Sequence, residues 1–226
     1  MKELILNDLF NNNKNALNPD LINSHINDVK QMMLIHYSGI KEVETKLDIL
    51  NQEFQIQEQR NPIEYVKSRV KSLESITQKL RRRNLPISTK SAVENLHDIA
   101  GVRVICSFVD DIYHVAEMLK KQDDITVIEE KDYIKNPKKN GYRSYHLVVE
   151  VPVFFSACMR MVKVEVQIRT IAMDFWASLE HKLFYRKDDL DHSSEEVYKK
   201  LLKCAQVISQ TDLEMQEIRN MVSEIE

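Results

Sequence analysis

In the nine residues MVKVEVQIR (Met161–Arg169), apolar and polar side chains alternate from Val162 to the end. Successive side chains of an extended chain point to opposite faces, so this period of two predicts a β-strand. One face would carry Val162, Val164, Val166 and Ile168, and the other Lys163, Glu165, Gln167 and Arg169. The apolar face predicts contact with a hydrophobic core, whereas the polar face lies either in solvent or on the floor of a polar cleft.

Further strands and helices surround this segment. Short β-branched runs predict strands over Ile99–Phe108, Ile125–Glu129 and Tyr145–Val151. Apolar residues at a period near 3.6 predict four helical regions: Asn18–Gln57, Asn61-Pro62 to Asn84, Asp110–Lys121, and the chain after Thr170. The first is expected to be interrupted near Ser38-Gly39, and the last to break around Asp188–Ser193. Four or five strands with helices before, between and after them predict an α+β domain.

Composition predicts a cytoplasmic protein without a membrane span. Among 226 residues, 43% are hydrophobic and 30% are charged, enough for a core beneath a charged surface. No apolar run approaches the roughly 20 residues that cross a bilayer, and the apolar stretch at the amino terminus is too short and acidic for a secretory signal. Cys106, Cys158 and Cys204 form neither a disulfide pattern nor a zinc motif, which predicts reduced thiols.

Positive charge gathers in one part of the chain. From Arg60 to Asn84 there are eight Lys or Arg against two Glu, whereas Asp188–Glu226 carries ten acids against four bases. On the predicted helix, a stripe about three turns long could hold a triphosphate or could be an ordinary solvated face; it contains Lys67, Lys71, Ser75, Lys79 and Arg82. Arg69 falls within the apolar arc of that helix, so it needs a carboxylate, solvent or a ligand.

Two carboxylates are candidates for a metal site. Asp98 stands at the start of a predicted strand that contains Arg103, and Glu165 lies on the polar face of another. If that face lines a cleft, the two acids could share a Mg²⁺ ion, which takes one or two carboxylates together with substrate phosphates and water. The pair His97-Asp98 alone does not predict a metal-dependent phosphohydrolase, because the further His and Asp ligands are missing.

The segment Lys135–His146 predicts a basic loop that ends on aromatic residues. A base stacked on Tyr142 would gain roughly 1–3 kcal/mol, with Lys138, Arg143 and His146 available for phosphates. The alternative is a mobile basic hairpin loop. The chain has only three glycines, and two of them, Gly101 and Gly141, fall in these segments, which indicates positions where a side chain would obstruct.

Four ordered motifs together resemble the synthetase domain of the RelA/SpoT family, and the chain is similar to a small alarmone synthetase. The motifs are Ser68–Lys71, Asp98–Arg103, Gly141–His146, and Glu165–Thr170 running on to Phe175-Trp176 and Glu180-His181. The resemblance implies a mixed sheet of nucleotidyltransferase type with long terminal helices. It also implies an N-terminal helical segment over 1–57, a catalytic domain over 58–187 and a C-terminal, possibly oligomerising helix over 188–226.

The resemblance further implies a reaction in which ATP gives its β,γ-pyrophosphate to the 3′-hydroxyl of GDP or GTP, which leaves AMP and forms the alarmones ppGpp and pppGpp. Arg69 and Arg103 would sandwich the adenine, and the ATP phosphates would be held by Lys71, Ser75, Lys79 and Arg82. Asp98 and Glu165 would bind Mg²⁺, and Glu165 would accept the 3′-hydroxyl proton. The acceptor nucleotide would be held by Lys138, Tyr142, Arg143, His146, Gln167 and Asp174.

Within the family, Asp174 and its neighbours favour the RelP type over the RelQ type, in which the usual Asn contacts the acceptor; the choice between GDP and GTP stays open. The chain has no room for the hydrolase and regulatory domains of the long members, so synthesis without hydrolysis is expected. The resemblance implies a homotetramer, and the predicted last helix offers an apolar stripe for it: Leu201, Ala205, Ile208, Met215, Ile218 and Val222.

Two other functions fit parts of the sequence. A different Mg²⁺-dependent nucleotidyltransferase would release pyrophosphate in place of AMP. A non-catalytic RNA-binding module could use the basic stretch and Tyr142, and its binding would survive the loss of magnesium and of Glu165.

Overall fold

A computed structural model describes residues 19–58, 60–184 and 195–225. Its five strands are β1 (Ile63–Val70), β2 (Ala100–Cys106), β3 (Thr126–Asp132), β4 (Tyr145–Phe154) and β5 (Met159–Thr170). Its helices are α2 (Pro19–Glu58), α3 (Leu73–Arg82), α4 (Thr89–Asn95), α5 (Val109–Lys120), α6 (Ile171–Phe184) and α7 (Glu195–Ser223).

The strands form one mixed sheet in the order β1-β2-β5-β4-β3. β2 and β5 are parallel, and the other neighbours are antiparallel. This confirms the predicted α+β fold with a mixed sheet of four to five strands. The alternating strand Met161–Arg169 lies in the centre of the sheet, and the residues of its predicted apolar face are buried: Val162, Val164, Val166 and Ile168.

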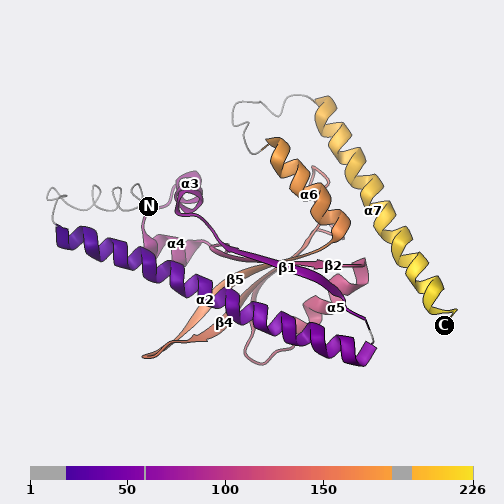
Figure 1. Ribbon diagram of the computed structural model, residues 1–226. Coiled ribbons are helices and arrows are strands. Elements are labelled where there is room, and N and C mark those ends of the chain that lie inside the picture. The colour runs from indigo at the N-terminus through magenta and orange to yellow at the C-terminus, as the bar shows by residue number, and fades with distance from the viewer. Residues whose placement is uncertain (1–18, 59, 185–194, 226) are drawn as a thin grey trace.

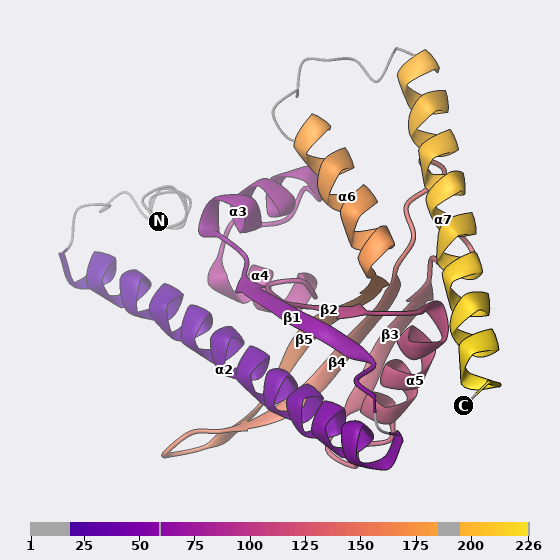
Figure 2. The same ribbon diagram turned by 45° about the vertical axis from the view of Figure 1, so that its right-hand side comes forward.

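One face of the sheet carries the main hydrophobic core. α2 crosses this face diagonally and α5 lies beside it, as Figures 1 and 2 show. Fully buried residues of both helices, such as Leu47 and Ile112, pack against β-branched residues such as Val104, Val149 and Val166. α6 follows directly after β5 at one end of the sheet, and α7 runs alongside α6 and on past α5. Since α2 and α5 cover one face, the polar residues of β5 lie on the opposite, uncovered one.

The predicted helix from Asn61-Pro62 to Asn84 is wrong in its first half. Residues Ile63–Val70 form the edge strand β1, and only Leu73–Arg82 are helical, with Ser72 as the N-cap. A β-bulge between Ile63 and Tyr65 explains the error. The extra residue of a bulge shifts the alternation by one, so apolar residues three apart share one face and imitate a helical period. The cationic stripe therefore does not run along one helix.

The predicted interruption of the first helix near Ser38-Gly39 is also wrong, because α2 is continuous from Pro19 to Glu58. Gly39 has a packing reason: a Cβ on this residue would lie 2.6 Å from Cγ1 of Val162. The missing side chain lets α2 lie directly on β5.

α6 and α7 form an antiparallel pair at one end of the sheet (Figure 2). The indole N–H of Trp176 donates to the carbonyl of Leu201 at 3.2 Å, and Ala205 is buried between the helices. Asp212 of α7, itself buried, accepts a hydrogen bond of 2.7 Å from the hydroxyl of Thr170 at the end of β5. The predicted break around Asp188–Ser193 lies outside the described residues.

None of the described helices is both long and apolar enough to cross a lipid bilayer.

Candidate active site

The polar face of β5 continues across the sheet because the neighbouring strands are in register. Gln167 pairs with Arg103 of β2 and with His146 of β4. Two residues earlier on β5, Glu165 pairs with Gly101 of β2. Directly paired residues lie on the same face of a sheet, so these predicted residues from three strands share one surface.

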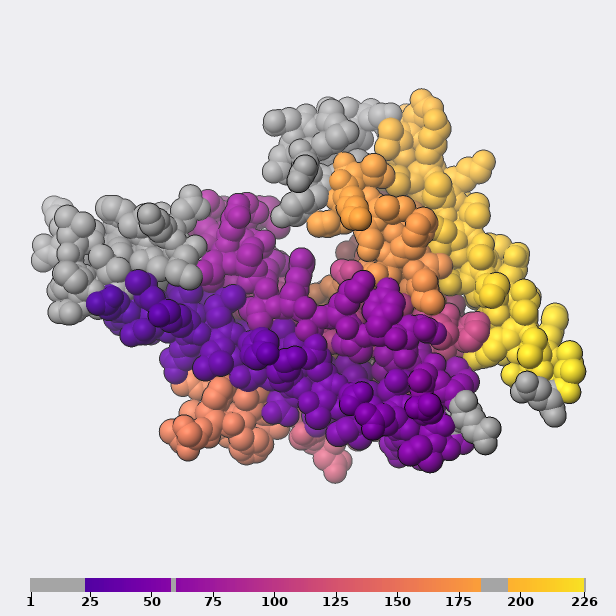
Figure 3. Space-filling model, viewed as in Figure 1, coloured from indigo at the N-terminus to yellow at the C-terminus, as the bar shows by residue number. Residues whose placement is uncertain are grey.

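The first cavity opens on this surface beside β1 and has a volume of about 380 Å³. Figure 3 shows the molecule hollowed between α3 and α6 on this side. Gly101 forms part of the cavity wall, and a Cβ there would meet only the carbonyl oxygen of Arg69, at 3.8 Å. Six of the predicted residues line it together: Arg69, Lys71, Asp98, Arg103, Glu165 and Gln167.

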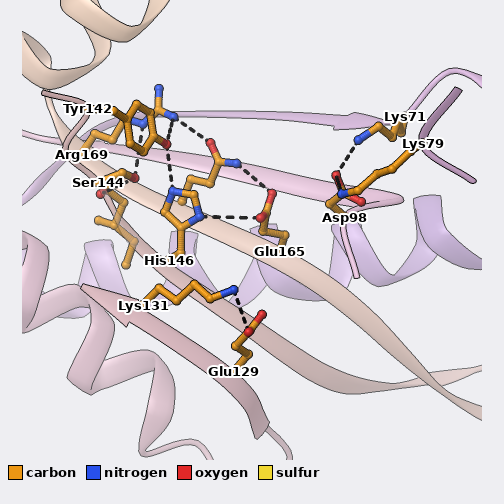
Figure 4. Close-up of polar contacts among 12 residues, drawn as sticks. Lys71, Lys79, Asp98, Glu129, Lys131, Tyr142, Ser144, His146, Glu165 and Arg169 are labelled. Atoms are coloured by element: carbon orange, nitrogen blue, oxygen red, sulfur yellow. Dashed lines mark hydrogen bonds and ion pairs between the residues drawn. The ribbon is translucent and has the colours of Figure 1, made fainter. Parts of the chain in front are cut away.

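Asp98 is the electrostatic centre of this cavity. Its Oδ2 lies 2.5 Å from Nζ of Lys71 and 2.7 Å from Nζ of Lys79 (Figure 4). Burial alone would raise the pKa of Asp98, but the hydrogen bonds and charges of the two lysines outweigh burial and hold that pKa below its usual value. Oδ1 is buried without a hydrogen-bond partner among the described residues.

A second, smaller cavity of about 140 Å³ lies on the β3 side of Glu165. Two of the residues expected to bind the acceptor nucleotide, Lys138 and His146, line it. The full lining is Glu129, Lys131, Tyr133, Lys138, His146, Val148 and Glu165. Glu165 is the one residue that lines both this cavity and the first. A carboxylate at that wall can contact the contents of both cavities at once.

The basic loop closes the second cavity with aromatic rings. Nζ of Lys138 lies 4.7 Å from the ring centroids of both Tyr133 and Tyr142. Gly141 has φ of +91°, and a Cβ there would lie 2.5 Å from Cβ of Ala205 in α7. The loop therefore turns at Gly141, where a side chain would collide with α7, as the sequence predicted. On this side the loop packs against Leu202 and Ala205 of α7.

The carboxylate of Glu165 has two polar neighbours: Gln167, which lines the first cavity, and His146, which lines the second. Nε2 of Gln167 donates to its Oε2 at 2.8 Å, and Nδ1 of His146 lies 3.6 Å from its Oε1. Burial raises the pKa of Glu165, but the contacts with His146 and Gln167 outweigh burial and lower that pKa overall. Burial also lowers the pKa of His146 more than Glu165 raises it, so that pKa lies below its usual value.

Arg169 is a site residue that we did not single out from the sequence. Its side chain is only 4% exposed, and its guanidinium contacts Asp174, Tyr142, Gln167 and Ser144. Its place on the polar face of an alternating strand is the signal that could have revealed it.

Asp174, a predicted acceptor contact, is buried under two arginines. Its Oδ1 lies 3.0 Å from Nη1 of Arg103 and 3.0 Å from Nη1 of Arg169. One carboxylate therefore links an arginine of the first cavity to the arginine that contacts Tyr142.

Six predicted residues line neither cavity. Lys79, Tyr142 and Asp174 contact a residue that does, namely Asp98, Lys138 and Arg103 respectively. The other three are Ser75, Arg82 and Arg143. The hydroxyl of Ser75 contacts the N-cap Ser72 at 2.9 Å, and Arg82 is exposed near the end of α3. Arg143 donates to the carbonyl of Ile134 at 2.8 Å. Substrate contacts by these three residues stay predictions.

The largest cavity described, about 670 Å³, lies elsewhere, between α2, α4 and the strands β4 and β5. It contains none of the predicted site residues, and its charged lining residues are of both signs: Asp28, Lys90, Glu94, Glu150, Arg160 and Lys163.

One known family matches the part of the chain that contains almost all the residues lining both cavities. Residues 68–190 match the pattern described as "Region found in RelA / SpoT proteins". The chain belongs to the RelA/SpoT family. The matched range of this RelA/SpoT chain includes every residue that lines the first cavity except Lys67.

Individual RelA/SpoT proteins are similar over most of the chain. The GTP pyrophosphokinase YwaC of Bacillus subtilis is 49% identical over 174 residues, which cover 74% of this chain and 83% of YwaC. The crystal structure of small alarmone synthetase 1 of B. subtilis bound to its product pppGpp has a TM-score of 0.77 and 39% identity, over 85% of this chain and 97% of that one. The same synthetase bound to AMPCPP has a TM-score of 0.72 and 37% identity, over 86% and 97%.

Proposed function

We propose that this chain is a GTP diphosphokinase, which transfers the β,γ-pyrophosphate of ATP to the 3′-hydroxyl of GDP or GTP and releases AMP. The observation that carries the proposal is the position of Glu165 on the wall shared by two adjacent cavities. A transfer between two nucleotides needs a group that reaches both. The similarity to synthetases bound to pppGpp and to AMPCPP supports this choice of nucleotides.

ATP would occupy the first cavity. The guanidinium groups of Arg69 and Arg103 would sandwich the adenine, since arginine stacks flat on aromatic rings. Lys71 and Lys79 would bind the phosphates. They contact Asp98 in the structure, so phosphate oxygens would take over part of their hydrogen bonding.

The acceptor nucleotide would occupy the second cavity. Guanine would stack on Tyr142 and displace Lys138 from that ring, which would bring this lysine toward the acceptor phosphates. His146 and Gln167 would border the ribose, because both contact the carboxylate of Glu165.

In the reaction, a carboxylate oxygen of Glu165 accepts the proton of the 3′-hydroxyl. The freed oxygen forms a bond to the β-phosphorus of ATP. The bond between that phosphorus and the α,β-bridging oxygen breaks, and its electrons leave with AMP. Alignment and charge neutralisation supply most of the rate in such transfers, and the lysines around Asp98 supply positive charge here.

Asp98 and Glu165 would also hold the magnesium ion that the family implies. The donor set fits: two carboxylates line one cavity, and Oδ1 of Asp98 is buried without a hydrogen-bond partner among the described residues. The described chain has no group of three or more His, Cys, Asp or Glu suited to a metal. Two protein carboxylates with substrate phosphates are nevertheless the usual environment of Mg²⁺. When bound, the ion would neutralise phosphate charge.

The test is product analysis with labelled ATP and GDP, for the wild type, Glu165→Gln and the control Glu150→Gln on β4. We expect AMP and a guanosine product without free pyrophosphate. Glu165→Gln should reduce turnover by about 10²–10⁴-fold, the usual contribution of a general base, and leave ATP binding within a few-fold. Release of pyrophosphate would indicate another nucleotidyltransferase. RNA binding that survives both the loss of magnesium and Glu165→Gln, without turnover, would indicate an RNA-binding module.

We also propose that the chain assembles as a homo-oligomer, a tetramer by family resemblance, in the cytoplasm. Apolar side chains that are 43–57% exposed repeat every four residues along α6: Ile171, Phe175, Leu179 and Leu183. On α7, Leu201, Ala205 and Ile208 pack toward Trp176, whereas Met215, Ile218 and Val222 are about half exposed. A second copy could cover these surfaces. Light scattering should give a mass of four chains, and a monomer at assay concentration would contradict the proposal.

A further inference from the structure

Arg169 stands at the start of two hydrogen-bond chains that end on the same carboxylate (Figure 4). Its Nη2 lies 2.5 Å from the hydroxyl of Tyr142 and 2.9 Å from Oε1 of Gln167. Tyr142 and Gln167 in turn lead to Glu165, the first through His146 and the second directly.

The guanidinium fixes the direction of the first chain. Arginine has donors only, so the Tyr142 oxygen accepts from Arg169 and its single proton is free for Nε2 of His146, at 2.8 Å. Nε2 then accepts, and a neutral imidazole must carry its proton on Nδ1. That N–H faces Oε1 of Glu165 at 3.6 Å, so the last link of this chain is an electrostatic contact slightly longer than a hydrogen bond.

The second chain is fixed in the same way. The atom of the Gln167 amide that faces Arg169 must be the oxygen, because two donors would repel. The amide nitrogen therefore faces Glu165 and donates to Oε2 at 2.8 Å. Each oxygen of Glu165 thus faces an N–H group, and the carboxylate is held as an acceptor.

Without Arg169, both chains could reverse. The tyrosine hydroxyl oxygen could accept a hydrogen bond from an Nε2–H group of His146, and the lone pair of Nδ1 would then face Glu165. The Gln167 amide could rotate and present its oxygen to the carboxylate. Either change would place an atom with partial negative charge against the carboxylate of Glu165, which must accept a proton.

Further contacts hold the side chain of Arg169 in place. Oδ1 of Asp174 neutralises it at 3.0 Å, and Nε lies 3.3 Å from Oγ of Ser144. Ser144 is fully buried and donates onward to the carbonyl of Ile168 at 3.3 Å. Four contacts on one almost inaccessible side chain leave it a single orientation.

We propose that Arg169 is a positioning residue for Glu165: as an obligate donor, it sets the direction of both hydrogen-bond chains, so that an N–H group faces each carboxylate oxygen. The inference rests on the proposed role of Glu165 as the acceptor of the 3′-hydroxyl proton. Arg169 reaches the reacting atoms only through Tyr142, His146 and Gln167.

The direct test is the tautomer of His146 in the substrate-free wild type. Two-bond ¹H–¹⁵N correlation spectra at a pH where the ring is neutral, assigned with His146→Asn, should show the proton on Nδ1. A proton on Nε2 would overturn the proposal. This measurement needs no turnover, so it stands even if the chain proves to catalyse another reaction.

The kinetic test compares Arg169→Met and Arg169→Lys with Arg160→Met, which removes an exposed arginine from the same strand. Arg169→Met should lower kcat by about 100-fold, as expected for a misplaced reacting group, with the Kd of AMPCPP unchanged and the His146 tautomer mixed. Arg169→Lys should recover part of kcat, because one ammonium cannot reach all the partners. Wild-type kcat in Arg169→Met would refute the proposal. If Arg169→Met does not fold, the His146 tautomer of the wild type and the kcat of Arg169→Lys still test the proposal.

Discussion

A substitution at Gly101 can separate an effect on ligand binding from an effect on protein stability. Among the three glycines, a Cβ at Gly39 or at Gly141 would lie 2.6 or 2.5 Å from another side chain, whereas at Gly101 the nearest atom is 3.8 Å away. The protein itself therefore has room for a Cβ at Gly101, so the obstruction expected there does not come from protein atoms. Groups added at this position would enter the first cavity, where a ligand would meet them.

The substitution Gly101→Val adds three carbon groups to the wall of that cavity. At about 30 Å³ for each group, close to the volume of a water molecule, they would fill roughly a quarter of the 380 Å³. A β-branched residue is also favoured in a strand, and replacing a compatible glycine typically stabilises a protein by about 0.4–1 kcal/mol. We therefore expect unchanged or higher stability together with AMPCPP affinity at least about tenfold weaker, a loss of about 1.4 kcal/mol.

Urea unfolding and calorimetric titration with AMPCPP measure the two effects separately. Gly141→Ala is the comparison variant: its positive φ and the contact with Ala205 should cost about 1–3 kcal/mol of unfolding free energy. If Gly101→Val binds AMPCPP like the wild type, ATP does not occupy the first cavity. If it unfolds as easily as Gly141→Ala, the open space beside Gly101 is not real.

Three further predictions concern single side chains. Tyr142→Ala should raise the acceptor KM by about 5- to 150-fold, the equivalent of roughly 1–3 kcal/mol of stacking, with AMPCPP binding unchanged; an unaltered KM would exclude stacking. The lowered pKa of Asp98 means that its contribution to stability is complete above the usual value and is lost as pH falls through the lowered pKa. The difference in unfolding free energy between the wild type and Asp98→Asn should therefore shrink in acid, and a constant difference from pH 7 to pH 3 would contradict this. Asp212→Ala should destabilise the fold by about 1–3 kcal/mol by removing the buried acceptor of the Thr170 hydroxyl, whereas exposed Glu214→Ala should have little effect; equal unfolding midpoints would count against this role.

Most strands could be predicted because their patterns are local. The alternation of Met161–Arg169 identified the central strand and placed Glu165 and Gln167 on the uncovered face. β1 could not be recognised, because its bulge changes the spacing of Ile63 and Val66 and its pairing with β2 lies far away in sequence. Tertiary pairing there overrides the helical pattern that we inferred.

Which acidic and basic side chains would form ion pairs could not be predicted from the sequence. Lys71 and Lys79 were expected to line one helix, but they reach Asp98 from the end of β1 and from α3. The burial of Asp174 under two arginines depends on how α6 meets the sheet. Likewise, the contact between Arg169 and Tyr142 depends on how the basic loop folds against the end of β5. The RelP-like subtype and the preference between GDP and GTP stay predictions.

The order β1-β2-β5-β4-β3 also has a consequence for how the protein is made. The middle strand of the sheet is the last to be synthesised, so β2 and β4 each expose an unpaired edge until residues up to about 170 have left the ribosome. Unpaired apolar edges favour aggregation. A nascent or truncated chain that ends before β5 would therefore depend on chaperones, and native folding should begin only when this strand inserts between the two halves.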